Sequence, residues 1–139
     1  MEQTPREKGL ALFEDIYGPE MTRGLEANLS TPGTFASLQS QWTVDFAFGE
    51  VWSREALARK ARSCAVIGML IAQRAHEELV YHTRMGLANG LTRSELEELV
   101  YTAIPYCGFP AAQAAKAAML EAFAAIDGDR GPASGLDDA

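Results

Sequence analysis

Cysteine and basic charge are both scarce in this chain. Only two cysteines, Cys64 and Cys107, occur among 139 residues. Their separation forms neither a Cys-x-x-Cys pair nor a zinc-ligand spacing, and this usage favours a reduced, cytoplasmic setting. Lysine and arginine total 12 against 19 aspartates and glutamates, which gives a formal net charge of −7. This balance disfavours nucleic acid and anionic membranes as partners, because both require a basic footprint.

Long apolar runs and targeting signals are missing as well. The longest apolar run, Cys64 to Ala72, is bracketed by Arg62 and Arg74 and is too short to span a bilayer. The N-terminus has no apolar segment typical of a signal peptide. With only two histidines, no metal site on a helix is predicted, and no glycine-rich phosphate loop is present.

Helical periodicity dominates what the sequence does contain. Hydrophobic residues make up 47% of the chain, enough to fill a core, and no alternating strand pattern appears. We therefore predict an all-α fold with a single domain over residues 9–126. A short lead, residues 1–8, precedes this domain. A Gly-, Asp-, Pro- and Ser-rich tail, residues 127–139, follows it and is expected to be disordered.

Local signals place several helix boundaries. Ser53 predicts the cap of a helix over about residues 54–75, whose second half is apolar almost all round and should be the most buried helix. Thr92 and Glu95 form a capping box that opens a later helix. Pro105 should bend or end that helix, because proline lacks a backbone donor and clashes with the preceding turn.

One helix carries the candidate acid–base chemistry. Glu78 and His82 lie four residues apart in a helix that closes at Gly90, so both side chains leave the same face. A carboxylate one turn before an imidazole can orient it and raise its pKa, which suits a general acid or base near neutral pH. The alternative is a surface ion pair, and spacing alone favours that reading because such pairs are common.

Aromatic and basic residues elsewhere are candidates for a pocket. Trp52, near Glu50, is either a core residue, which is the simpler interpretation, or the wall of an apolar pocket. Tyr106 could supply a phenol to such a pocket. Arg54 and Arg62 could grip a substrate carboxylate bidentately, or equally form structural or solvated ion pairs.

Five short motifs follow one another in a definite order. They are Phe48-Gly49-Glu50-Val51-Trp52-Ser53-Arg54, Arg62-Ser63, Glu78-Leu79-x-x-His82, Ala88-Asn89-Gly90-x-Thr92-x-x-Glu95 and Tyr106-x-Gly108-x-Pro110. The series resembles the carboxymuconolactone decarboxylase family, in its gamma-carboxymuconolactone decarboxylase branch, over about residues 6 to 125. The resemblance implies an all-α, alkylhydroperoxidase D-like fold with a central antiparallel helix pair, and a homo-oligomer that is often a trimer or hexamer.

A related branch, the alkylhydroperoxidase D-like proteins, carries Cys-x-x-Cys-x-x-x-His. Aligned on His82, its two cysteine positions are Ala75 and Glu78 here, so peroxidase activity is not expected. The decarboxylase branch implies loss of carbon dioxide from an unsaturated lactone acid without a cofactor. His82 would be the proton donor, Glu78 would tune it, and an arginine would hold a carboxylate.

This sequence departs from the branch at Thr102, where His or Gln is usual. A changed pocket keeps a second function open, a dehydratase or cyclase acting on a larger unsaturated carbonyl compound. A third is a non-catalytic oligomeric binding protein. The residues expected to line a substrate site are Trp52, Glu50, Arg54, Arg62, Ser63, Thr102 and Tyr106.

Overall fold

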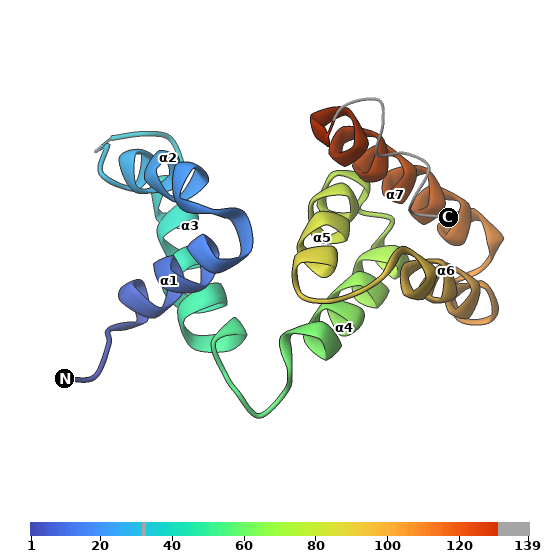
Figure 1. The fold of residues 1–139 in the computed structure, drawn as a ribbon, viewed down its shortest axis with the longest axis horizontal. Helices are drawn as coiled ribbons and strands as arrows, with labels where there is room; N and C mark the ends of the chain where they lie inside the picture. Colours follow the sequence, from blue (N-terminus) through green and yellow to red (C-terminus); the bar gives the residue numbers. More distant parts are fainter. Residues whose placement is uncertain (32, 131–139) are drawn as a thin grey trace. The chain divides into compact units, whose positions relative to one another are not determined.

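The computed structural model describes residues 1–31 and 33–130, with only the backbone of residues 129 and 130. Every regular element over these residues is a helix (Figure 1), which confirms the all-α prediction. The chain divides into two compact units, Met1–Ala58 and Arg59–Ala139, and we call these the N-terminal and C-terminal units. None of the described helices has the length and apolarity needed to cross a membrane.

The N-terminal unit contains α1 (Pro5–Tyr17), α2 (Pro19–Leu29), α3 (Ser37–Trp42) and the π-helix η1 (Thr43–Trp52). Thr4 begins α1: its hydroxyl accepts the backbone N–H of Glu7 at 3.2 Å, and the Glu7 carboxylate accepts the Thr4 N–H at 3.1 Å. Gly18, at φ 90°, ends α1 in a region that residues with a side chain avoid. The π-helix follows α3 directly, so the two form one continuous helical segment.

Aromatic packing joins α1 to η1. The rings of Phe13 and Phe48 lie 5.8 Å apart between centroids, close enough for a favourable aromatic contact. Phe13 also lies 4.7 Å from Tyr17, one turn along α1. Val44 and Trp52 of η1 are buried too. The N-terminal unit therefore has a core of its own between these two helices.

Two glycines allow α1 and η1 to approach at backbone distance. A Cβ atom added to Gly49 would lie 2.1 Å from the carbonyl oxygen of Pro5, and one added to Gly9 would lie 2.1 Å from that of Val44. Real Cβ atoms essentially never come within 3.0 Å of such an atom. The spacing of the two helices therefore requires a hydrogen in place of a side chain at both positions.

The C-terminal unit contains α4 (Arg59–Gln73), α5 (His76–Ala88), α6 (Arg93–Cys107) and α7 (Phe109–Arg130). Two residues join α4 to α5. A Cβ atom at Gly86 of α5 would lie 3.2 Å from Ile67 of α4. The Asn89 amide, one residue beyond α5, donates to the hydroxyl of Ser63, near the start of α4, at 3.0 Å. The two helices thus run antiparallel, as the family resemblance implies.

The core of the C-terminal unit uses one face of each helix. Ile67, Ile71 and Leu79 are fully buried between α4 and α5. The face of α7 that meets them is made of alanines, among them Ala115 and Ala118, which are also fully buried. Small side chains on this face let α7 pack closely against both α5 and α6.

A bidentate ion pair ties the start of α6 to the end of α7. The Arg93 guanidinium donates to both Asp127 carboxylate oxygens, with the shorter contact, Nη2 to Oδ1, at 2.6 Å. The same guanidinium carbon lies 4.4 Å above the centre of the Phe123 ring. Planar stacking and paired hydrogen bonds suit arginine in this position.

Two sequence predictions about the helix after η1 were wrong. The helix expected from residue 54 begins at Arg59, because the Ser53 hydroxyl donates to the Gly49 carbonyl at 2.6 Å inside η1 and does not cap a following helix. That helix is buried along one face only, and Met69 is 60% exposed. Pro105 was expected to bend or end its helix. It lies inside α6, which runs on to Cys107, so it does not end the helix, and the bend stays a prediction.

The helices at both ends of the described residues extend past the predicted domain bounds of 9 and 126. α1 begins at Pro5, inside the predicted lead over residues 1–8. α7 continues to Arg130, so residues 127–130 of the predicted tail are helical. The rest of that tail, residues 131–139, lies outside the described residues. The capping box at Thr92 and Glu95 is confirmed, with Glu95 N–H to Thr92 hydroxyl and Thr92 N–H to Glu95 carboxylate both at 3.0 Å.

Candidate active site

His82 lies in the middle of α5, largely covered by protein. Its side chain is 14% exposed, whereas the Glu78 side chain one turn earlier is 64% exposed. The His82 Nε2 and the nearer Glu78 carboxylate oxygen are 3.8 Å apart, which is an ion-pair distance but too long for a hydrogen bond. Glu78 therefore acts on His82 through its charge, from the solvent side.

Burial lowers the pKa of His82 below its ordinary value of 6.5, because an imidazolium loses hydration inside the protein. The negative charge of Glu78 acts in the opposite direction and raises the pKa, but it is the smaller effect. The sequence predicted that Glu78 would raise the pKa of His82, and its charge does so. The net shift is nevertheless downward, because burial has the larger effect. At neutral pH the unliganded protein thus holds His82 mostly as neutral imidazole.

The second histidine provides a useful contrast. His76 Nε2 lies 2.6 Å from a carboxylate oxygen of Glu121 on α7, and both side chains are about half exposed. This is a solvent-exposed contact between two helices, of a kind that contributes little to stability. His82 differs from it in being largely covered by protein, with a side chain only 14% exposed.

Ser63, a predicted substrate residue, is 1% exposed. Its hydroxyl oxygen accepts the Asn89 amide N–H described above, so Ser63 lies at the contact between α4 and α5. The side-chain oxygen of Asn89 is buried without a hydrogen-bond partner. In this chain the pair holds the end of α5 to the start of α4.

The other predicted residues of the C-terminal unit differ in exposure. Arg62 is half-buried on α4, the helix that packs against the His82 helix. Thr102 is exposed, and its hydroxyl donates to the Glu98 carbonyl at 2.8 Å within α6. Tyr106 is 85% exposed. Thr102 and Tyr106 are one turn apart, so they share a face of α6.

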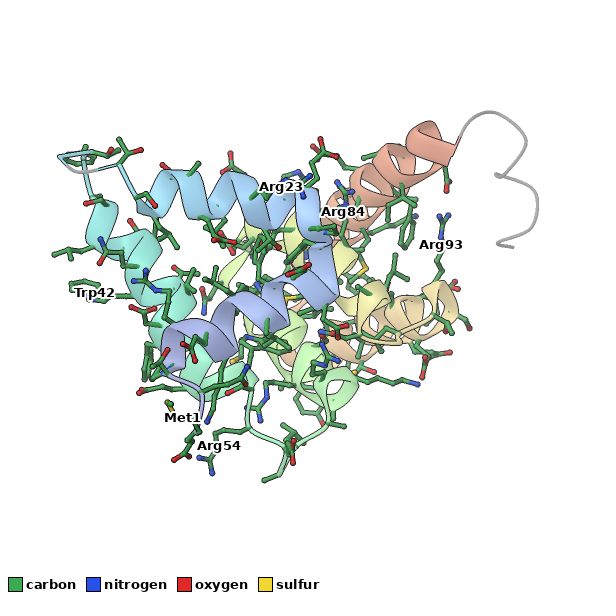
Figure 2. The ribbon with its side chains drawn as sticks, turned by 60° about the vertical axis from the view of Figure 1, so that its left-hand side comes forward. Met1, Arg23, Trp42, Arg54, Arg84 and Arg93 are labelled. Carbon is green, nitrogen blue, oxygen red and sulfur yellow. The ribbon has the colours of Figure 1, made fainter. Side chains whose placement is uncertain are left out.

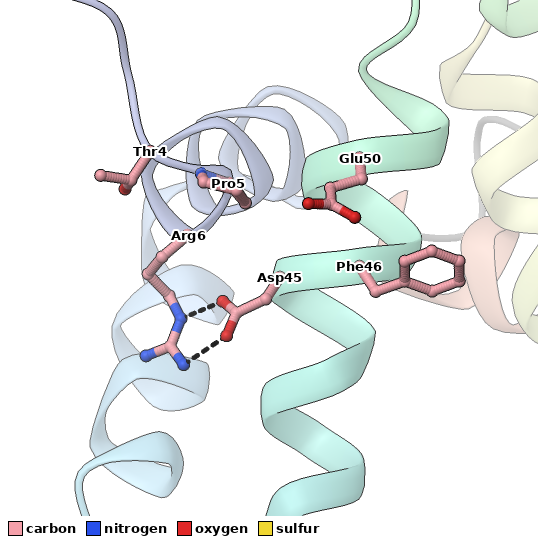
Figure 3. Close-up of a pocket in the computed structure, with 6 residues that line it drawn as sticks. All are labelled: Thr4, Pro5, Arg6, Asp45, Phe46 and Glu50. Atoms are coloured by element: carbon pink, nitrogen blue, oxygen red, sulfur yellow. Dashed lines mark hydrogen bonds and ion pairs between the residues drawn. The ribbon is translucent and has the colours of Figure 1, made fainter.

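The remaining predicted residues belong to the N-terminal unit. Trp52 is buried and Arg54 is exposed. Glu50 is exposed and lines an open hollow of about 380 Å³ between the start of α1 and η1. Figure 3 shows its carboxylate on the same side of η1 as Asp45, turned toward α1. The six lining residues are Thr4, Pro5, Arg6, Asp45, Phe46 and Glu50.

An ion pair in this hollow was not foreseen from the sequence. Arg6 and Asp45 join in a two-pronged contact (Figure 3), with Arg6 Nη2 to Asp45 Oδ2 at 2.9 Å. The arginine lowers the pKa of Asp45, chiefly through the side-chain hydrogen bonds. The two residues are 39 positions apart, so no local spacing signals their contact. The same holds for Ser63 and Asn89, which are 26 positions apart.

Proton transfer is the chemistry that the described side chains can support. A buried imidazole with one carboxylate within 4 Å can move a proton to or from a bound molecule. Over the described part of the chain, no three or more His, Cys, Asp or Glu side chains gather in a way that could hold a metal ion.

Comparison with known proteins gives a consistent result. The model of the carboxymuconolactone decarboxylase family matches residues 40–121. A 4-carboxymuconolactone decarboxylase from Acinetobacter baylyi is 44% identical over 117 residues, which cover 84% of this chain and 84% of the relative. The nitrosuccinic acid decarboxylase npaB from Metarhizium robertsii is 36% identical over 104 residues, or 75% of this chain and 71% of the relative.

Proposed function

The chain belongs to the carboxymuconolactone decarboxylase family, and from this premise we propose that it is a cofactor-independent decarboxylase of an unsaturated lactone acid. His82 supplies the proton, and Glu78 tunes its pKa. The observation that carries this proposal is the His82 environment: a side chain 14% exposed with a carboxylate oxygen 3.8 Å away.

The proposed reaction needs one bond broken and one proton delivered. The carbon–carbon bond to the carboxylate breaks, carbon dioxide leaves, and the electron pair moves into the conjugated carbonyl group to give a dienolate. Protonated His82 then donates its proton to carbon, forming the new carbon–hydrogen bond. Solvent reprotonates the imidazole before the next turnover. Each turnover consumes one proton, so no base is needed in the chemical step.

The lowered pKa of His82 makes the donor role dependent on pH and on substrate. Since burial lowers this pKa below 6.5, only a minority of unliganded molecules carry the imidazolium at neutral pH. A substrate carboxylate near the ring adds negative charge, which favours the protonated form. Substrate binding and protonation of His82 therefore assist each other, because their coupling is reciprocal.

Arg62 is the better of the two arginines to hold a substrate carboxylate. It is half-buried on α4, which packs against the His82 helix, and a guanidinium in a partly dry position binds a carboxylate more strongly than one in water. Arg54 is exposed and lies in the other unit. We keep Trp52, Glu50, Thr102 and Tyr106 as proposed contributors to substrate selection.

Decarboxylation is favoured over the dehydratase or cyclase alternative by the names of the relatives. Both relatives are decarboxylases, one named for 4-carboxymuconolactone and the other for nitrosuccinic acid. The alignment with the 4-carboxymuconolactone decarboxylase covers 84% of this chain and 84% of the relative, at 44% identity. We therefore propose 4-carboxymuconolactone as the first substrate to test and nitrosuccinic acid as the second.

The experiment is a carbon dioxide release assay with both acids, using the native chain, His82→Gln and His76→Gln. His82→Gln should lower kcat by about 10²- to 10⁴-fold, the usual contribution of a general acid. His76→Gln is the matched control, because this histidine is half exposed and paired with Glu121, and it should retain native turnover. A native rate in His82→Gln would refute the role of His82 as proton donor, and no carbon dioxide from either acid would remove both acids as substrates.

The role of Glu78 is tested by the pH profile. With His82 as the donor, kcat/KM should fall about tenfold per pH unit above the His82 pKa. Glu78→Gln removes the charge that raises this pKa, so the fall should begin at lower pH. A rate loss without movement of the profile would show that Glu78 does not tune His82.

A further inference from the structure

Four residues share one face of α5 and its end, and His82 is among them. They are Glu78, His82, Met85 and Asn89, at successive spacings of four, three and four residues, and we call them the His82 row. Along this row the Glu78 side chain is exposed, the His82 side chain is largely covered and Met85 is fully buried. Arg84, labelled in Figure 2, lies on another face of α5 and is exposed. The His82 row therefore leads from solvent into the protein.

Asn89 extends this row one residue beyond the end of α5. Its backbone N–H donates to the Met85 carbonyl at 2.9 Å, which is the hydrogen bond of an α-helix, so Asn89 still follows the helical path. Its side-chain amide donates to the Ser63 hydroxyl on α4 at 3.0 Å. The inner end of the His82 row is thus tied to α4.

The two helices approach each other closely beside this hydrogen bond. A Cβ atom added to Gly86 would lie 3.0 Å from Leu91 Cδ1, 3.2 Å from Ile67 Cδ1 and 3.9 Å from the Cβ of Ser63. Ile67 and Leu91 belong to the apolar core of the C-terminal unit. Ser63 and Asn89 therefore form a polar pair next to an apolar contact.

Stability alone does not account for a polar pair in this place. Ser63 is buried, and the side-chain oxygen of Asn89 is buried with no hydrogen-bond partner among the described residues, which costs free energy. Apolar side chains would fill the same space without that cost. What the hydrogen bond adds is a single alignment, because it forms at only one register of the two helices. A buried asparagine fixes the register of coiled coils in the same way.

We propose that Ser63 and Asn89 are positioning residues that fix the register of α5 against α4, and with it the place of His82 relative to Arg62. Arg62 directly precedes Ser63, and His82 lies seven residues before Asn89, about 10 Å along the helix. This inference rests on the proposed function, in which Arg62 holds a substrate carboxylate and His82 delivers the proton. It replaces the substrate contact that the sequence predicted for Ser63.

Register affects the rate because proton transfer tolerates little misplacement. A slip of one helical turn would move His82 by about 5.4 Å along α4, and a misplacement of about 1 Å can already lower a rate by roughly 10²-fold. Arg62 would still bind the substrate carboxylate. Loss of the register should therefore lower kcat and leave KM close to its native value.

Ser63→Ala is the first test variant, because it removes only the hydroxyl. Its kcat for carbon dioxide release from 4-carboxymuconolactone should fall about 10- to 100-fold, with little change in KM. Asn89→Ala removes the other half of the pair and should have the same effect. Combining the two substitutions should lower kcat no further than either one alone, because the two side chains act as one unit.

A second readout follows His82 itself and needs no substrate. The chain has only two histidines, so proton NMR gives one set of imidazole signals for each, and His76→Gln assigns them. In Ser63→Ala the His82 ring should be better hydrated, so its pKa should rise toward 6.5. His76, which contacts Glu121 of α7 in solvent, should titrate as in the native chain.

Thr83→Val is the matched control. Thr83 is fully buried and adjacent to His82 in the sequence, but its hydroxyl donates to the Leu79 carbonyl at 2.6 Å within α5. This change therefore removes a buried hydroxyl without breaking a link between α4 and α5. Its kcat and its His82 titration should both stay close to native.

Several results would overturn the proposal. A native kcat in Ser63→Ala, or a lower kcat with an unchanged His82 titration, would mean that the pair does not position His82. An equal loss in Thr83→Val would mean that any buried hydroxyl of this core has the same effect, and additive losses in the double variant would mean that the two side chains act separately. If the native chain does not release carbon dioxide, the His82 titration still decides the register proposal. If the register proposal fails, His82→Gln still decides the catalytic one.

Discussion

Substitution of Gly49 by alanine tests one of the two close contacts between α1 and η1. The new Cβ would lie 2.1 Å from the Pro5 carbonyl oxygen, 2.8 Å from its carbonyl carbon and 3.1 Å from its Cα. All three atoms are backbone, so no side chain can rotate away. Relief requires the start of α1 to move from η1 by about 1 Å, a displacement that packed interiors resist.

The expected cost follows from two opposing effects. Overpacking of this kind costs typically about 1–3 kcal/mol, and a backbone obstacle places Gly49→Ala at or above the top of that range. Alanine recovers up to about 1 kcal/mol, because glycine is the poorer helix former. The net loss in the free energy of unfolding should therefore be about 2 kcal/mol. For a chain of this size that lowers Tm by roughly 6–10 °C.

Gly24→Ala is the matched control for this prediction. Gly24 lies in α2, and a Cβ there would meet nothing within 4 Å. This change should raise the free energy of unfolding by about 0.5–1 kcal/mol. Denaturant titration at one protein concentration, followed by the emission of buried Trp52, measures both variants. If Gly49→Ala stabilises the protein as Gly24→Ala does, the close contact of α1 and η1 does not exist in solution.

Three further predictions address the C-terminal unit. Since burial lowers the pKa of His82 below 6.5, the unfolded chain binds more protons just below that pH. The free energy of unfolding should therefore fall as the pH drops below 6.5, and His82 should not affect it at higher pH. If a His82→Gln variant shows the same pH dependence, His82 is not its source. Arg93→Ala removes the paired contact with Asp127 and the stacking on Phe123, and should cost about 1–2 kcal/mol in denaturant titration. Arg93→Lys should restore less than half of that loss, and full restoration would show that charge alone matters. Thr92→Ala removes a helix cap and should cost about 1 kcal/mol by the same titration, whereas no loss would mean that water replaces the cap.

Local chemistry was predictable from the sequence. The capping box at Thr92 and Glu95 depends on residues within one turn of each other, so their spacing is enough to locate it. The same reasoning put Glu78 and His82 on one face, where the structure has them 3.8 Å apart. The net direction of the shift in the His82 pKa was not predictable in this way, because the burial that causes it depends on packing between helices.

Long-range contacts account for most of what the sequence did not reveal. Ser53 was expected to begin a helix, but its hydroxyl donates a hydrogen bond to the Gly49 carbonyl within η1. A π-helix has no simple hydrophobic period by which the sequence would indicate it. The Arg6–Asp45 and Ser63–Asn89 contacts join residues 39 and 26 positions apart. Each of these residues looks like an ordinary surface polar residue when the sequence is considered alone.

The motif around η1 shows why membership of a family constrains the fold of a chain more than it constrains the choice of substrate. Within residues 48–54, Phe48, Gly49 and Trp52 are buried, whereas Glu50 and Arg54 are exposed. Gly49 is required by the Pro5 carbonyl oxygen, whatever the substrate is. Exchanging an exposed polar residue leaves that packing intact and changes only what the surface can bind. Two relatives, at 44% and 36% identity to this chain, are named for different acids, so membership of the family does not by itself identify a substrate.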